Sequence, residues 1–304
     1  MLHPPRMSAP DYAPFQRGPF RLTMGLAPLD LRDWIEPDEH MSAELAVKEH
    51  LLCLRHEDVF AALPAARAGS AEVLDLLLAH LPTRFPALYR RVGTQLDNLL
   101  TGQCWNLTDA TLHPLDLAGR LVQEDLCLMQ QADNGTTYRL VGASVCFPTR
   151  WRLSDKMGKS LGAIHAPVPD YEPQLDASMD PFFSRLKTER PVWRLNWSLT
   201  DDPTLFQPTG HGQHTRNTNV TAANAGDTVW LRMERQTLRR LPGSGDILFT
   251  IRVYVHPLYS LAAYSGQAVA LAAAIRALPP AMQRYKSLPP IRDAVLAWLD
   301  NVES

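Results

Sequence analysis

The chain has 304 residues, of which 45% are hydrophobic and 20% are charged, a composition typical of a globular protein with a buried core rather than of a disordered chain. The formal net charge is −2. The chain therefore lacks the strong positive charge that would attract nucleic acid or an anionic membrane surface. The sequence lacks an apolar run of about 18 residues that would span a membrane, and its first residues lack the apolar stretch of a signal peptide. We therefore expect a cytoplasmic protein without a nucleic acid or membrane partner.

The sequence contains neither a GxGxxG nucleotide-binding fingerprint nor a Walker lysine loop. No two of its four cysteines have the CxxC spacing of a zinc or iron–sulfur site; they are Cys53, Cys104, Cys127 and Cys146. We expect these thiols to be reduced. Any electrons for redox chemistry would have to come from elsewhere.

The first third of the chain predicts helices. Apolar residues recur at roughly helical spacing over 43–63, 71–81 and 85–100, whereas 102–119 has the composition of a loop. Two further helices are expected near the end of the chain, over 265–278 and 291–302. The second of these follows Pro289-Pro290, and proline is well placed at a helix start.

The middle of the chain predicts five strands, over 121–130, 137–147, 192–199, 228–241 and 246–256. Asn134-Gly135 is a strong signal for a hairpin between the first two. Together they predict an α+β fold, a PAS-like five-stranded antiparallel sheet with helices on one face. We expect three regions that form one compact unit: an N-terminal extension with helices over 1–119, the sheet core over 120–256, and C-terminal helices over 257–304.

The segment 151–169 holds the most informative pattern. Ser154 is a good N-cap, and Met157, Leu161, Ile164 and His165 would share one face of a single short helix. A histidine at the end of an apolar stripe could bind a haem iron. The alternative is an ordinary histidine at a helix C-terminus, where its positive charge is favourable.

In the last three predicted strands, polar and apolar residues alternate, and each strand carries charged residues on its polar face. Arg194 and Asn196 share one face of their strand, Arg232 and Glu234 share a face of the next, and Arg252 lies on a face of the third. If these faces coincide, they place Arg194, Arg232, Glu234 and Arg252 together. The alternative is a solvated face with cross-strand ion pairs.

A long, ordered set of motifs includes these residues. It comprises Gly25-Leu26, Trp34-Ile35, Asp155-Lys156, Ile164-His165 with Pro167-Val168-Pro169, Arg194 with Asn196-Trp197, Glu234-Arg235-Gln236-Thr237-Leu238, and Leu248-Phe249-Thr250-Ile251-Arg252. In these motifs the chain resembles the haem-dependent oxidative N-demethylase family, roughly over residues 15–300.

The resemblance implies a PAS-like fold that binds haem b, and an oxygen-dependent enzyme of monooxygenase type. In the family, a methyl group is removed from a small alkylamine such as dimethylamine, and formaldehyde is formed. Electrons come from NADPH through flavin and an iron–sulfur centre on partner subunits. Because this chain has no motif for those groups, we expect a separate reductase as partner.

The resemblance also favours His165 as the metal ligand, with Met157, Leu161 and Lys156 at the cofactor and Lys156 paired with a propionate. Reasoning from strand faces, and not from the family, assigns Arg194 or Arg252 to hydrogen-bond the bound oxygen and Glu234 to hold an alkylammonium substrate. Two other functions remain open: a haem-binding PAS-like sensor or carrier without turnover, and a haem-free interaction module.

Overall fold

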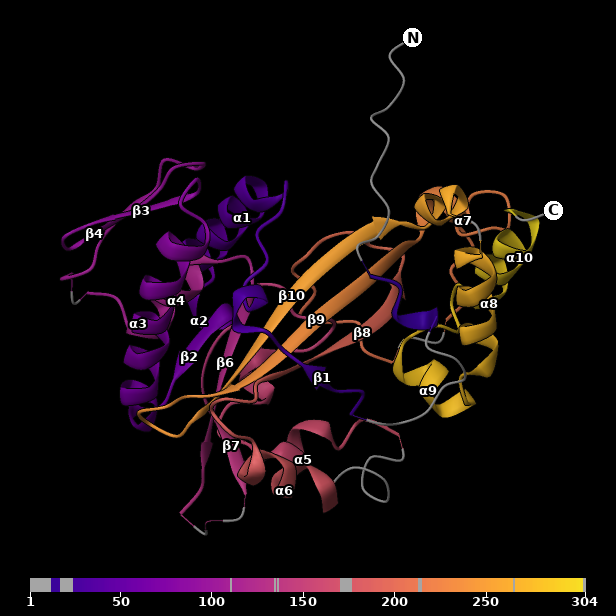
Figure 1. Cartoon of the computed structure of the whole chain (residues 1–304). Coiled ribbons are helices and arrows are strands. Elements are labelled where there is room, and N and C mark those ends of the chain that lie inside the picture. Colours follow the sequence, from indigo (N-terminus) through magenta and orange to yellow (C-terminus); the bar gives the residue numbers. More distant parts are fainter. Residues whose placement is uncertain are drawn as a thin grey trace.

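The computed structural model describes residues 12–16, 24–109, 111–133, 135, 137–169, 177–212, 215–264 and 266–302. It is a mixed α+β structure built on a seven-stranded antiparallel sheet in the order β1-β8-β9-β10-β6-β7-β2 (Figure 1). A separate three-stranded sheet, β3-β4-β5, lies beside the N-terminal helices. No helix in the described part of the chain is both long and apolar enough to cross a membrane.

All five predicted strands are present and adjacent in the large sheet. They are β6 (Asp125–Gln131), β7 (Tyr138–Ser144), β8 (Val192–Thr200), β9 (Trp230–Arg240) and β10 (Ile247–Pro257). The expected number of strands is too small, because β1 (Ala27–Pro28) and β2 (Phe60–Ala62) extend the two edges. Each covers part of an otherwise unpaired strand edge. Strands β6 and β7 pair as predicted, although Asn134 of their turn lies outside the described residues.

The N-terminal helical predictions are partly wrong. The first predicted helix divides into α1 (Met41–Leu54), α2 (His56–Val59) and strand β2, and the second becomes the longer α3 (Arg67–Arg84). The third, over 85–100, is instead a hairpin of β3 (Tyr89–Val92) and β4 (Gln95–Asn98). Gly93, with φ 57°, provides the left-handed conformation that the two-residue turn requires.

The segment predicted as a loop, 102–119, contains β5 (Cys104–Asn106) and the start of α4 (Pro114–Leu121). In the C-terminal region both predicted helices are confirmed, as α8 (Gln267–Ala277) and α10 (Arg292–Val302). The short helices α7 (Ala225–Thr228) and α9 (Pro280–Tyr285) were not predicted.

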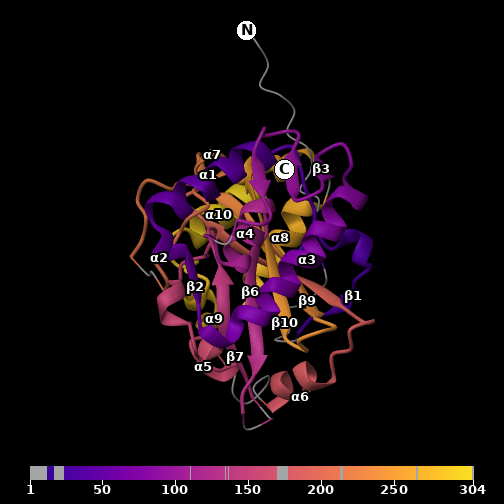
Figure 2. The ribbon, with the colours of Figure 1, turned by 90° about the vertical axis from the view of Figure 1, so that its left-hand side faces the viewer.

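The helices divide between the two faces of the sheet. Helices α1, α3 and α4 pack on one end of the face that carries Leu126 and Leu128, and α8 and α10 pack on the other end of that face, around Leu231 and Met233. On the opposite face α5 (Leu161–His165) and α6 (Ala177–Arg185) join an apolar cluster with Cys127. Figures 1 and 2 show α5 and α6 near β7, away from α7, α8 and α10. This second face holds the cavity described next.

Candidate functional site

A cavity of about 360 Å³ lies between the second face of the sheet and the segments that cover it. Its floor is formed by side chains that alternate along the strands, among them Cys127 of β6, Arg194 of β8, Glu234 of β9 and Phe249 of β10. The volume is in the range of cavities that bind small molecules or cofactors. Both apolar and charged side chains line it.

His165 lies in the wall of this cavity. The expected single helix is wrong: a short 3-10 turn at Leu153–Asp155 is separated from α5 by Gly158, whose φ of 74° interrupts helical geometry. Ser160, not Ser154, caps α5, since its hydroxyl accepts a hydrogen bond from Ala163 N at 3.4 Å. Helix α5 nevertheless brings Leu161, Ile164 and His165 to the cavity together.

The imidazole of His165 is oriented by the backbone of its own helix. Its Nδ1 lies 2.9 Å from the carbonyl oxygen of Leu161. Since a carbonyl can only accept a hydrogen bond, Nδ1 carries a proton, and in the neutral imidazole the lone pair is then on Nε2. This is the tautomer that an axial Nε2 ligand requires.

The other predicted cofactor residues differ in position. Lys156 lines the cavity with its Nζ 4.4 Å from the centre of the Trp151 ring, and burial lowers the pKa of this lysine. Met157 packs in the apolar cluster next to α5 but is not a lining residue.

Glu234 is the centre of a group of polar side chains in the cavity. Its carboxylate accepts hydrogen bonds from Thr149 Oγ1 at 2.5 Å, Gln236 Nε2 at 2.8 Å and Asn196 Nδ2 at 3.3 Å. Beside it on β8, Arg194 also faces the cavity, and its buried Nε has no hydrogen-bond partner among the described residues. Burial lowers the pKa of Arg194. The predicted proximity of Arg194 and Glu234 is therefore present, because β8 and β9 pair with Arg194 opposite Gln236 and Asn196 opposite Glu234.

Arg232 lies next to this site but does not line the cavity. It is 1% exposed and donates to the backbone oxygens of Phe147, Thr204 and Leu205, and to Thr149 Oγ1 at 3.0 Å. With these acceptors, the guanidinium holds the loop that follows β7 against β9.

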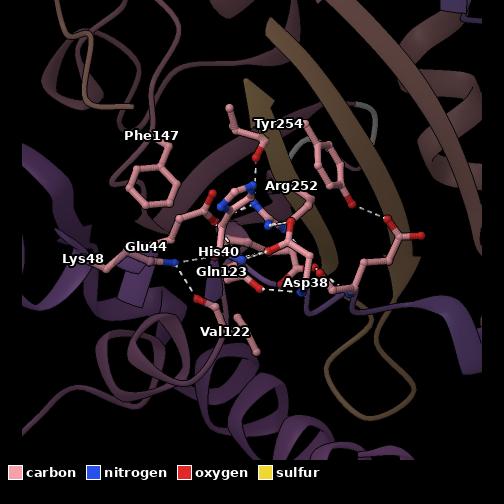
Figure 3. A network of polar contacts seen from close by, with 12 residues as sticks. Asp38, His40, Glu44, Lys48, Val122, Gln123, Phe147, Arg252 and Tyr254 are labelled. Carbon is pink, nitrogen blue, oxygen red and sulfur yellow. Dashed lines mark hydrogen bonds and ion pairs between the residues drawn. The ribbon is translucent and has the colours of Figure 1, made fainter. Parts of the chain in front are cut away.

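The expectation that Arg252 shares this face is wrong. Strands β9 and β10 pair with Val253 opposite Glu234 and Arg252 opposite Arg235, and residues directly opposite each other point to the same face. Arg252 therefore points to the other side of the sheet, where it contacts Asp38 at 2.5 Å and Glu44 at 2.7 Å (Figure 3). At 1% exposure its role there is structural.

Three consecutive cavity residues at the end of α9 were not predicted from the sequence: Tyr285, Lys286 and Ser287. Lys286 Nζ donates to Trp197 O at 2.5 Å and to Asn196 Oδ1 at 3.1 Å. Ser287 has φ 52°, and its hydroxyl accepts from Gly212 N at 3.0 Å. These residues lie in a short proline-flanked stretch with no periodic pattern, so nothing in the sequence marks them.

The cavity fits a haem group by the chemistry of its lining. Within the described part of the chain, Lys156, Arg194 and Lys286 make no salt bridge to a carboxylate, and Glu234 is the only acid among the described lining residues. Burial lowers the pKa of all three cations, so each is stabilised by an incoming anion. Haem would bring two propionates for the cations, an apolar ring for the apolar lining residues, and four ring nitrogens for its iron, so that one histidine suffices.

Fold and cavity together define an α+β protein with a cavity suited to haem. The family model described as "Haem-dependent oxidative N-demethylase, alpha subunit-like" matches residues 25–296. The chain belongs to this family, as the resemblance predicted. The family name indicates an oxidative enzyme that depends on haem, and one subunit of a larger assembly.

Proposed function

We propose that this protein binds haem b in the cavity, where His165 would hold its iron, and removes a methyl group from a small alkylamine similar to dimethylamine. The family supports the chemistry. The observation that carries the assignment to this cavity is the combination of an oriented imidazole with three half-buried cations and one acid.

Each charged residue has a distinct proposed role. Lys156, adjacent to α5, pairs with a propionate. Arg194, whose Nε lacks a partner within the described chain, would donate a hydrogen bond to the oxygen substrate. Glu234 holds the alkylammonium group by a charge-assisted hydrogen bond. Thr149, Gln236 and Asn196 fix the position of that carboxylate before the substrate arrives.

When bound, haem supplies the binding and activation of oxygen at its iron. The overall reaction consumes one amine, one oxygen molecule, two electrons and two protons, and gives the demethylated amine, formaldehyde and water. Because the sequence has no motif for flavin, nicotinamide or iron–sulfur groups, we propose that NADPH-derived electrons arrive from a separate reductase. The "alpha subunit-like" description supports such a partner.

We also propose that β6 to β10 form a PAS-like core over 120–256. In chain order these strands lie as 2-1-5-4-3, with α5 and α6 between the second and the third. Residues 1–119 and 257–304 would be extensions of one compact unit, since their helices form apolar clusters with strands of the core.

Two measurements test the proposal. Purified protein is titrated with haemin while the Soret band is followed, and the loaded protein is then supplied with a reductase system, oxygen and dimethylamine while formaldehyde is measured. We expect one haem per chain, and formaldehyde that depends on all three additions. Failure to bind haem contradicts the proposal. Haem binding with reversible oxygen binding, but without formaldehyde, would instead identify a sensor or carrier.

A further inference from the structure

The ammonium group of Lys286 lies in a site built to recognise an ammonium. Two oxygen atoms accept its hydrogen bonds, Trp197 O at 2.5 Å and Asn196 Oδ1 at 3.1 Å. The ring of Trp197 lies 5.2 Å away, within the range of a cation–π contact. Lys286 directly follows α9 and reaches the outer edge of β8. On that edge β1 pairs only with Val192 and Trp193, so Asn196 and Trp197 have no strand neighbour there among the described residues.

This ammonium site is coupled to Glu234 through one side chain. The Asn196 amide accepts from Lys286 with Oδ1 and donates to Glu234 Oε2 with Nδ2, at 3.3 Å. Lys286 and Glu234 thus bind opposite ends of the same amide. The orientation that suits the lysine is also the one that suits the carboxylate.

We propose that Lys286 determines the affinity for the amine, as an internal ammonium whose charge competes with that of a substrate alkylammonium in the electrostatic field of Glu234. The inference rests on the proposed role of Glu234. A second cation that enters the cavity is attracted by Glu234 and repelled by Lys286, so the lysine weakens amine binding. It thereby limits occupation of the cavity by alkylammonium ions when their concentration is low.

The groups around Lys286 determine how easily it loses its proton. Glu234 of β9 favours the charged form of Lys286, whereas Arg194 of β8 disfavours it. The other polar side chains nearby are Tyr285 of α9 and His211, which packs on the Tyr285 ring. Burial lowers the pKa of Lys286 to about 8. Its proton is therefore given up more easily than that of an exposed lysine when another cation binds nearby. Alkylammonium ions, with a pKa near the ~10.4 of lysine, stay charged at that pH.

The test measures affinity rather than turnover. Dimethylammonium chloride is titrated by calorimetry into haem-loaded protein, at pH 7 and at pH 9, for the wild type and for Lys286→Met, Lys286→Arg and Glu234→Gln. The exposed Lys159 provides a matched control, Lys159→Met. We expect Lys286→Met to bind roughly tenfold more tightly at pH 7, the effect of about 1.4 kcal/mol of removed repulsion. Wild-type affinity should rise from pH 7 to pH 9, and this rise should be absent in Lys286→Arg and Lys286→Met.

The outcomes separate the inference from the proposed function. If Lys286→Met binds no more tightly than the wild type while Glu234→Gln weakens binding, the competition is refuted and the role of Glu234 stands. If Glu234→Gln has no effect, or no variant binds the amine, the proposed substrate site and the inference both fail. Should Lys286→Met not fold, an unchanged wild-type affinity between pH 7 and pH 9 refutes the inference.

Discussion

The single hydroxyl of Thr149 connects Arg232 to Glu234, and these two charged side chains make no direct hydrogen bond to each other. Its Oγ1 accepts a hydrogen bond from Arg232 Nε at 3.0 Å and donates one to Glu234 Oε1 at 2.5 Å. Because the hydroxyl hydrogen is directed to the carboxylate, the loop after β7 fixes the acid in the cavity. The site therefore depends on a residue outside the strands.

Replacement of Thr149 tests this connection. Thr149→Val keeps the shape of the side chain but leaves Arg232 Nε and one oxygen of Glu234 without this partner, so the free energy of unfolding should fall by about 1–3 kcal/mol. Urea unfolding measures the loss, and Thr149→Ser, which keeps the hydroxyl, is the control. Equal stability of the Val and Ser variants would show that the hydroxyl contributes nothing.

Glu234→Gln should retain haem but lose affinity for the amine. Removal of one charged hydrogen bond at a buried site costs about 1.5–3 kcal/mol, or roughly tenfold to a hundredfold in affinity. Amine-induced shifts of the haem spectrum measure the affinity. A lower melting temperature with an unchanged amine titration would make Glu234 structural and place the substrate elsewhere.

His165→Ala should lose most of its haem, or bind it with a displaced Soret band, because the proposed axial ligand is gone. The matched control is His211→Ala, since His211 also lines the cavity but packs on the Tyr285 ring at 5.0 Å between centroids. Haem content and absorption spectra are compared after identical loading. The ligand assignment is wrong if the His165 variant keeps the wild-type spectrum.

Replacement of Arg252 should lower the stability of the fold, whereas replacement of Arg194 should lower the affinity for oxygen. Arg252→Met leaves the carboxylates of Asp38 and Glu44 without their cation in a buried network (Figure 3), which should lower the free energy of unfolding by about 3–5 kcal/mol. Arg194→Met removes a half-buried cation without a salt bridge, so stability should be retained while the affinity of ferrous haem for oxygen falls. Urea unfolding and oxygen titration check the two expectations. A marginal loss for Arg252→Met would contradict its structural role.

Asp125 should make stability depend on pH. Burial raises its pKa from 3.8 to about 6, although its carboxylate accepts hydrogen bonds from Cys146 N and Phe147 N and lies 3.9 Å from Lys48 Nζ. The folded chain therefore binds this proton more tightly than the unfolded chain. The contribution of Asp125 to stability is largest below pH 4, falls as the pH rises, and levels off above pH 6.

The change amounts to about 3 kcal/mol, at 1.36 kcal/mol per pKa unit. Urea unfolding of the wild type and of Asp125→Asn at several values between pH 4 and pH 7 isolates it, since asparagine does not titrate. The wild type should lose stability relative to the variant as the pH rises. A difference that stays constant over this range would show that the pKa of Asp125 is not raised.

Local patterns were sufficient for the five central strands of the large sheet and for part of the site. Alternation of apolar and polar residues predicted all five core strands, because a half-buried strand must alternate. It also indicated that Arg194 and Asn196 share a face, as do Glu234 and Gln236. The helix predicted over 85–100 was wrong, because its apolar spacing also suits a short hairpin and the left-handed turn at Gly93 favours the hairpin.

By itself, the sequence determined the fold class, the family and the apolar segment that carries His165, since these depend on composition, periodicity and motif order. Only the tertiary structure decided which faces of neighbouring strands coincide. Alternation shows which residues of one strand lie together, but the register between strands determines their neighbours, and an offset of one residue moved Arg252 to the opposite face from Glu234. The position of Lys286 beside Asn196, 90 residues earlier in the chain, was likewise decided by packing, because no local pattern encodes a contact made across the sheet edge by a distant segment.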